Sequence, residues 1–178
     1  MKALLIIDMQ NESFPEAYPS YDTDGVTKRI NLLSDEFHRK EDKIIYIQHD
    51  GSKQGCYIRG TEGWELLSSL NKNEDDLVIS KTANDSFYQT SLKDTLDKFH
   101  IDEIVVTGSA TDFCIDATVK SAITKDFNVT IIADAHTTTG SRYVPAKQLI
   151  DHYNWMWKEM SPTMGRIKVV ECEEFIQE

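Results

Sequence analysis

Short runs of apolar, often β-branched residues recur along the whole sequence, separated by stretches with the apolar spacing of a helix face. The runs lie at residues 3–7, 44–48, 77–80, 104–107, 129–133 and 167–170. Several are continuous rather than alternating, which is typical of strands covered on both faces. The helical spacing forms four stripes: Val26, Ile30, Leu33 and Phe37; Leu92, Leu96 and Phe99; Ile115, Val119, Ala122 and Ile123; Leu149, Tyr153, Met156, Trp157 and Met160. Strands that alternate with helices predict an α/β fold, a Rossmann-like three-layer αβα sandwich with a mostly parallel sheet of about six strands.

Length and composition fit one globular domain that spans residues 1–178. Hydrophobic residues make up 40% of the chain and charged residues 28%, as in ordinary globular proteins. No repeat, low-complexity tract or linker rich in Pro, Gly or Ser divides the sequence. We therefore expect a single domain.

The net charge of −11 disfavours polyanionic partners. An acidic surface repels phosphate backbones and anionic headgroups, so we expect a small-molecule substrate, with neither nucleic acid nor membrane as a partner. The apolar stretch after Met1 runs straight into Asp8 without a small-residue cleavage site, so no signal peptide is predicted. The 3 cysteines stand at long spacings and form no disulfide framework, which predicts a cytoplasmic protein.

Polar residues directly after a strand are the candidates for a site, because open α/β sheets bind ligands beyond the carboxyl ends of their strands. Asp8 follows the first apolar run, Lys81 follows the third, and Cys114 lies in the segment after the fourth. His49 follows the second run. The pattern predicts a carboxylate, an ammonium and a thiol at one edge of the sheet.

Cys114 lies near the predicted start of a helix. Thr111 is the expected N-cap, with Asp112 in the first turn. At this position free backbone N–H groups and the helix dipole favour a thiolate, and a nearby Lys ammonium would favour it further. A carboxylate could take the thiol proton and later give it to a leaving amine, while backbone N–H groups of the turn could bind an oxyanion.

Each of these residues also has an ordinary structural interpretation. A lone cysteine near a helix start is more often a small buried hydrophobe than a nucleophile. Asp8 alone could cap a turn, and Lys81 alone is typical of a solvated charge. Their joint position after three strands favours a site, but spacing alone does not decide between the two interpretations.

Four segments, LLIIDMQN, DLVISKTANDSFYQTSL, VVTGSATDFCIDATVKSA and ADAHTTT, lie in this order between residues 4 and 139, a span that covers most of the chain. In this order they resemble the isochorismatase-like cysteine hydrolases, which include nicotinamidases, N-carbamoylsarcosine amidases and ureidoacrylate amidohydrolases. The resemblance implies a catalytic triad of Asp8, Lys81 and Cys114. It also implies a cis peptide bond between Ser109 and Ala110, and an oxyanion hole made by the N–H groups of Ala110 and Cys114. The implied reaction cleaves a C–N bond of a small amide, ureide or carbamoyl substrate through a thioester.

The sequence departs from the metal-dependent nicotinamidases, which carry an Asp-x-His element and a further His after the second strand. Here Gln48, His49 and Asp50 stand at that place, so we expect no catalytic metal, no cofactor, and His49 as a hydrogen-bonding pocket residue. Hydrolysis of an isochorismate-type vinyl ether, which does not require the thiol in this family, is an alternative. Its dianionic substrate would need cationic anchors; Arg59 and Arg142 are the candidates, although a solvated surface role is expected for each.

The pocket walls are predicted less directly, from residues in loops and beside the triad segments. The expected substrate-binding residues are Gln10, Phe14, His49, Trp64, Phe87 and His136. Large aromatic residues line hydrophobic cores about as often as pockets. The resemblance implies a homo-oligomer, a dimer or a tetramer, with one of Trp155 and Trp157 facing the sheet and the other a partner subunit. A non-catalytic flavodoxin-like module that binds a small molecule is a further alternative, although no G-x-G-x-x-G or Walker A motif is present.

Overall fold

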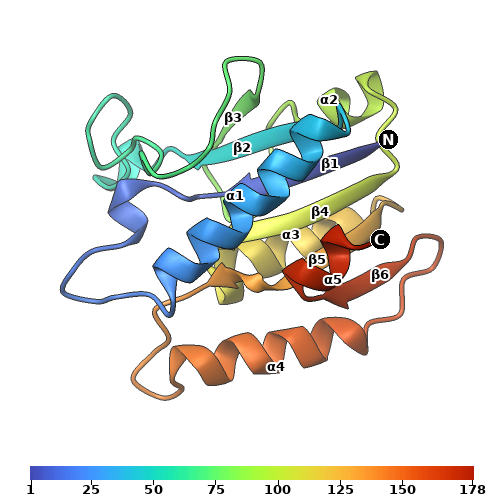
Figure 1. Ribbon diagram of the computed structural model, residues 1–178. Helices are drawn as coiled ribbons and strands as arrows, with labels where there is room; N and C mark the ends of the chain where they lie inside the picture. Colours follow the sequence, from blue (N-terminus) through green and yellow to red (C-terminus); the bar gives the residue numbers. More distant parts are fainter.

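Six parallel strands form one sheet in the computed structural model, which describes all residues from Met1 to Glu178. The strands follow the order β3-β2-β1-β4-β5-β6 across the sheet (Figure 1). Their bounds are Lys2–Ile7 (β1), Lys43–His49 (β2), Leu77–Lys81 (β3), Glu103–Ser109 (β4), Asn128–Thr137 (β5) and Ile167–Val170 (β6). All six predicted strands are present, and the expectation of a mostly parallel sheet is confirmed.

Helices cover both faces of the sheet (Figure 1). One face carries α1 (Thr23–Arg39) and α5 (Cys172–Ile176), whose apolar side chains share a core with alternate residues of β1. The other face carries α2 (Leu92–Lys98), α3 (Asp116–Ile123) and α4 (Ala146–Lys158). The predicted three-layer sandwich is therefore confirmed. The sequence did not predict α5, because its 5 residues are too few to show a helical period.

Strand β1 is the centre of both cores. Ala3, Leu5 and Ile7 pack into the core shared with α2, α3 and α4, whereas Leu4 and Ile6 pack against α1 and α5. Successive side chains of a strand point to opposite faces, so a strand covered on both sides must be apolar throughout. This explains why the first run of the sequence shows no alternation.

Strand β5 is longer than the sequence predicted. The expected run ends at Ala133, but the strand continues to Thr137, with an irregular register opposite Val106 and Gly108 of β4. The extension brings His136 opposite Gly108. The polar residues that end β5 therefore lie beside the segment that leads to Cys114.

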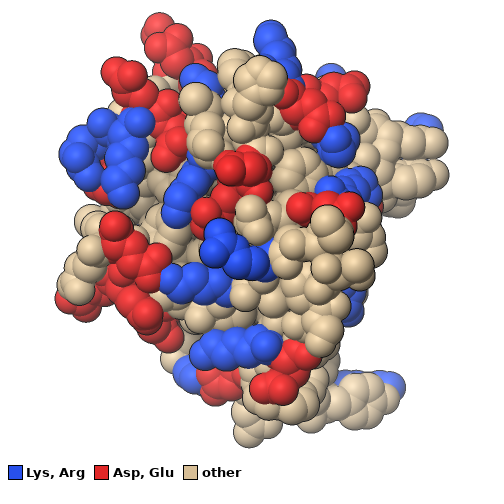
Figure 2. Space-filling model, turned by 90° about the vertical axis from the view of Figure 1, so that its right-hand side faces the viewer, with Lys and Arg blue, Asp and Glu red and all other residues tan.

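The face at which the strands begin carries acidic and basic side chains interspersed, without a broad patch of either sign (Figure 2). Lys2 and Glu103 form an ion pair there, as do Lys168 and Glu178. None of the helices is both long enough and apolar enough to span a bilayer.

The strand order reverses between β1 and β4, and their ends come very close together. Ile7 pairs with Gly108, whose φ of 116° is unfavourable for a residue with a side chain. A Cβ atom at this glycine would lie 2.1 Å from the Ile7 carbonyl oxygen. The crevice at such a reversal is where open α/β folds bind ligands, so this contact fixes the floor of the candidate site.

Replacing Gly108 by alanine should lower the free energy of unfolding by at least about 3 kcal/mol, since the new methyl group meets both an unfavourable φ and a backbone atom. Urea denaturation measures this change. Gly55→Ala is the matched control: Gly55 also has a positive φ, of 77°, but no atom lies within 4 Å of its added Cβ. Its cost should be about 1 kcal/mol. Equal costs at the two glycines would show that the approach of β1 to β4 imposes no constraint.

Candidate active site

The structure brings the carboxylate, the ammonium and the thiol together at the carboxyl edge of the sheet. The Lys81 Nζ atom lies 2.7 Å from Asp8 Oδ2 and 3.2 Å from Cys114 Sγ. All three residues are buried, and Lys81 is only 1% exposed. Three segments far apart in the chain thus build one buried polar cluster.

Backbone geometry aims two of these side chains inward. Asp8 directly follows β1 and adopts a left-handed conformation with φ of 51°, and its N–H donates to the Ile47 carbonyl at 2.9 Å. Lys81 is the last residue of β3, and its ammonium also donates to the Ala83 carbonyl at 3.0 Å. The ammonium therefore has four partners in the chain, Asp8, Cys114, Ala83 and His49, which compensate for the loss of water.

Cys114 lies in a π-helical turn, Thr111–Ile115, which leads directly into α3. The N–H groups of Phe113 and Ile115 both donate to the Ala110 carbonyl, each at 3.1 Å. Ala110 is the N-cap residue, so the expectation that Thr111 caps this helix is wrong. The Thr111 hydroxyl instead lies 2.9 Å from His136 Nδ1, because β5 runs alongside the turn.

The segment before the turn has the cis peptide bond that the resemblance implied, between Ser109 and Ala110. The Ala110 N–H finds no acceptor in the chain. Both Ala110 and Cys114 line the same cavity. A free backbone N–H group therefore lies in the same cavity as the thiol, where an oxyanion could accept its hydrogen bond.

The cavity beside the thiol has a volume of about 300 Å³. Asp8 is the only acidic or basic residue that lines it apart from His49, and Asp8 is already paired with Lys81. The other lining residues are polar without charge, aromatic, or small: Ser13, Ser20, Tyr57, Asn84, Ser109, Ala110, Phe113, Cys114, Thr138 and Thr139. The site suits a small ligand that carries hydrogen-bonding groups and no net charge.

Burial controls the ionisation of the cluster. Burial and the negative charge of Asp8 raise the pKa of Cys114 from 9.0 to about 12, and Lys81 opposes this shift only in part. Lys81 lowers the Cys114 pKa, as the sequence led us to expect, but burial and Asp8 outweigh it, so the net shift disfavours a thiolate in the resting site. Burial disfavours the charged form of Lys81 as well, but Asp8 and Cys114 outweigh it and raise the Lys81 pKa. The resting cluster holds a thiol, an ammonium and a carboxylate.

His49, the last residue of β2, lies in the cavity wall as predicted. Its Nδ1 atom is 3.4 Å from the Lys81 ammonium, and its ring packs edge-on against Tyr57 with 5.4 Å between centroids. Burial and the charge of Lys81 lower the His49 pKa, so a neutral imidazole faces the cavity. Tyr57 is a wall residue that sequence reasoning missed, because it lies in the long loop between β2 and β3, which has no periodic pattern.

Other wall residues were also missed, although some carried a signal. Phe113 directly precedes Cys114, and this position was the signal available in the sequence. In the structure its side chain is exposed, which is unusual for a phenylalanine in a turn beside the core. Thr138 and Thr139 directly follow β5, so the carboxyl-end rule would have found them. Ser13, Ser20 and Asn84 lie in irregular segments, for which the sequence offers no signal of position.

Five predicted substrate-binding residues do not line this cavity: Gln10, Phe14, Trp64, Phe87 and His136. Gln10 is fully buried, and its side-chain amide bonds to the backbone of His49 and Trp64, so it braces the loop. Phe87 lies in the hydrophobic core. Phe14 packs against the opposite core. Main-chain groups therefore occupy the Gln10 amide and apolar neighbours surround Phe87, whereas Phe14 and Trp64 are half-buried outside the cavity wall.

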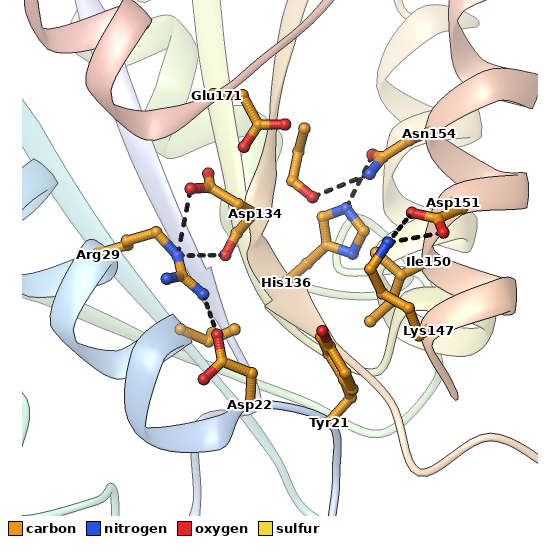
Figure 3. Close-up of a pocket in the computed structure, with 12 residues that line it drawn as sticks. Tyr21, Asp22, Arg29, Asp134, His136, Lys147, Ile150, Asp151, Asn154 and Glu171 are labelled. Carbon is orange, nitrogen blue, oxygen red and sulfur yellow. Dashed lines mark hydrogen bonds and ion pairs between the residues drawn. The ribbon is translucent and has the colours of Figure 1, made fainter. Parts of the chain in front are cut away.

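His136 and the two arginines have other surroundings. His136 is 1% exposed and faces a separate hollow between α1, β5 and α4, shown in Figure 3. Arg59 lies over the Trp64 ring, 5.7 Å from its centroid, and pairs with Asp50. Neither Arg59 nor Arg142 lines the cavity beside Cys114. The structure thus brings no guanidinium to the thiol.

No group of three or more His, Cys, Asp or Glu side chains is arranged to hold a metal ion. That the chain works without a metal stays a prediction. Trp157 is buried against the core, whereas Trp155 is 59% exposed on the surface. The subunit contact expected at one of these two residues also stays a prediction.

A family model for the isochorismatase domain matches residues 2–165. The chain belongs to the isochorismatase family. It is 31% identical over 161 residues to the isochorismatase-family protein YddQ of Bacillus subtilis, which covers 86% of this chain and 88% of YddQ. Streptothricin hydrolase of Streptomyces noursei is 30% identical over 140 residues, which covers 78% of this chain and 55% of that enzyme. An isochorismatase-family structure from Oleispira antarctica matches with a TM-score of 0.89 at 25% identity, over 99% of this chain and 96% of that one.

Membership of the isochorismatase family confirms the resemblance read from the sequence and makes the chain a hydrolase. It does not by itself give the bond that is cleaved. That question depends on the geometry and ionisation of the cluster around Cys114.

Removing one partner of the buried pair between Lys81 and Asp8 should lower the free energy of unfolding far more than removing one partner of a surface pair. Lys81→Met leaves the Asp8 charge buried and uncompensated, so we expect a loss of about 3–5 kcal/mol in the free energy of unfolding. The double variant Asp8→Asn/Lys81→Met should be more stable than Lys81→Met alone. Lys93→Met, which removes the exposed pair with Asp97, is the control and should change stability by about 0.5 kcal/mol or less. Similar losses at Lys81 and Lys93 would contradict a buried charge cluster.

The raised pKa of Cys114 predicts a pH dependence of stability. The folded state keeps the thiol proton up to a pKa of about 12, whereas the unfolded thiol loses it near 9.0. The stability that Cys114 contributes is therefore fully present below pH 9.0 and is lost as the pH rises toward about 12. In that window the wild type should lose up to about 1.4 kcal/mol per pH unit relative to Cys114→Ser, measured by urea denaturation. Parallel curves for the two proteins would contradict a protonated resting thiol.

Proposed function

We propose that this protein hydrolyses a C–N bond of a small, uncharged amide, ureide or carbamoyl compound through a thioester on Cys114. The observation that carries the proposal is the Lys81 ammonium, which lies within hydrogen-bonding distance of both Asp8 and Cys114. The arrangement supplies a thiol and an adjacent carboxylate base, one of the ways in which a cysteine nucleophile can be activated.

Asp8 is the general base of the proposed reaction. Its Oδ2 atom is paired with Lys81, whereas its Oδ1 atom is buried and has no hydrogen-bond partner. A thiol with a pKa of about 12 is scarcely ionised near neutral pH, so it needs an adjacent base to lose its proton. As the proton moves to Asp8, Lys81 stabilises the thiolate that forms.

The thiolate of Cys114 then attacks the substrate carbonyl carbon. The oxyanion accepts hydrogen bonds from the N–H groups of Ala110 and Cys114, and the proton held by Asp8 passes to the leaving nitrogen as the C–N bond breaks. This step leaves a thioester. Water, deprotonated by Asp8, attacks the thioester, releases the acid and returns the proton to the sulfur.

The uncharged cavity favours this reaction over the hydrolysis of an isochorismate-type vinyl ether. A dianionic substrate would lose its hydration without meeting an arginine, and the one ammonium nearby is already shared by Asp8 and Cys114. Burying unpaired charge is costly. Similarity to streptothricin hydrolase further supports hydrolysis as the chemistry of this site.

A panel of amides, ureides and carbamoyl amino acids, with isochorismate as the competing substrate, tests the proposal. Cys114→Ala should lower kcat/KM toward the C–N substrates by at least about a thousandfold, because the nucleophile is lost. The wild type should form a covalent adduct on the peptide that contains Cys114, detected by mass spectrometry after rapid acid quenching. Cys172→Ala is the control, since Cys172 lies in the core beside α1, away from the cavity. Unchanged turnover by Cys114→Ala would overturn the proposal.

A further inference from the structure

His136 lies at the contact of three elements: β5, which carries it, the turn that bears Cys114, and α4. Its Nδ1 atom is 2.9 Å from Thr111 Oγ1, and its Nε2 atom is 3.0 Å from Asn154 Oδ1. Figure 3 shows the imidazole directed toward the Asn154 amide, which in turn reaches back to the β5 backbone. These contacts form a chain of hydrogen bonds that ends beside the proposed oxyanion hole.

The donor and acceptor roles in this chain of hydrogen bonds follow from its Asn154 end. The Asn154 amide nitrogen donates to the Ala133 carbonyl at 2.9 Å, so its oxygen faces His136 and accepts from Nε2–H. Burial lowers the pKa of His136 to about 4, although the hydrogen bond that the ring donates to Asn154 opposes this shift, so the ring is neutral and carries one proton. Nδ1 is then an acceptor, and the Thr111 hydroxyl must donate to it. Each member of the chain has one role.

The chain fixes the segment on which the chemistry depends. Thr111 directly follows Ala110, whose N–H has no acceptor in the protein, and it begins the turn that carries Cys114. The backbone here is supported on the other side as well, since Ser109 pairs with Thr137 in the sheet. The hydrogen bond from Thr111 to His136 is one side-chain restraint at the junction between the sheet and the turn, and the Thr138 hydroxyl, which donates to Asp112 Oδ1 at 2.6 Å, is another.

Helix α4 holds the same junction through a second contact. The Trp157 indole packs edge-on against the His136 ring, with 5.2 Å between centroids, and its N–H donates to Asp116 Oδ1 at 3.1 Å. Asp116 is the first residue of α3, directly after the turn. One face of α4 thus contacts both the histidine and the helix that continues from Cys114.

We propose that His136 and Asn154 are positioning residues, which hold Thr111 so that the Ala110 N–H points at the developing oxyanion. The inference rests on the proposed function and extends it to residues that touch neither substrate nor thiol. The hollow that His136 faces does not serve as a second substrate site in this scheme, because its basic side chains are already paired, Arg29 with Asp22 and Asp134 and Lys147 with Asp151 (Figure 3). An error of about 1 Å in such a donor can cost a hundredfold in rate.

A matched pair of substitutions at Thr111 tests the proposal. Thr111→Val keeps the shape of the side chain and removes the hydroxyl, whereas Thr111→Ser keeps the hydroxyl. On the best C–N substrate of the panel, Thr111→Val should lower kcat by about 10- to 100-fold with little change in KM. Thr111→Ser should stay within about threefold of the wild type. Rates are expressed per reactive site, counted from the covalent adduct, so that a loss of folded protein does not mimic a loss of rate.

His136 gives the second arm of the test. His136→Phe should lower kcat as Thr111→Val does, and the double variant should be no worse than either single one, because both break the same hydrogen bond. His136→Gln, which offers both a donor and an acceptor, should recover part of the rate. Nitrogen NMR of the wild type should show His136 protonated only at Nε2, a signature that needs no turnover. His136 protonated at Nδ1 would overturn the proposal.

The outcomes separate this inference from the function on which it rests. A wild type that forms no adduct on Cys114 contradicts the proposed hydrolysis, and the positioning role falls with it. A normal adduct together with wild-type kcat in Thr111→Val contradicts the positioning role alone. Additive losses in the double variant would also contradict it, because they would show that the two side chains act separately.

Discussion

The buried ammonium of Lys81 is the interaction around which the rest of this site is organised. A lysine charge withdrawn from water is tolerated only when the protein supplies partners in good geometry. Here Asp8 supplies the counter-charge, Ala83 a carbonyl, and Cys114 a sulfur acceptor. Since these partners come from segments after different strands, the cluster can form only when the parallel sheet sets their ends side by side. The contacts that stabilise the buried Lys81 charge are therefore the same contacts that assemble the site.

That arrangement has a chemical consequence. The same burial that strengthens the pair between Lys81 and Asp8 keeps Cys114 protonated, because the loss of water and the Asp8 carboxylate both disfavour a second anion. In the proposed reaction, activation of Cys114 must then coincide with proton transfer to Asp8. The cavity adds no other charge, so selectivity depends on hydroxyls, an amide and two aromatic rings in its wall. A site of this kind separates ligands chiefly by charge and size.

Much of this was accessible from the sequence, and the errors have physical causes. Strand positions and the three residues of the cluster were found because apolar runs and the carboxyl ends of strands leave local patterns. The wall residues were mostly missed or misplaced. Phe87 and Gln10 look like pocket residues in sequence, yet one packs in the core and the other braces main-chain groups. Whether a polar or aromatic side chain faces a ligand depends on neighbours that are distant in the chain, and loops such as 50–76 carry no periodicity that would place them.

The sequence by itself determined the six strands and the four longer helices in their order along the chain, and with them the edge of the sheet at which Asp8, Lys81 and Cys114 must lie. It did so because side-chain periodicity and the handedness of βαβ units are local properties of the chain. Only the tertiary structure decided that the thiol is protonated, that Thr111 bonds to His136 instead of capping a helix, and that no arginine reaches the cavity. Those features arise from burial and from distances between residues far apart in the chain, which no local pattern encodes.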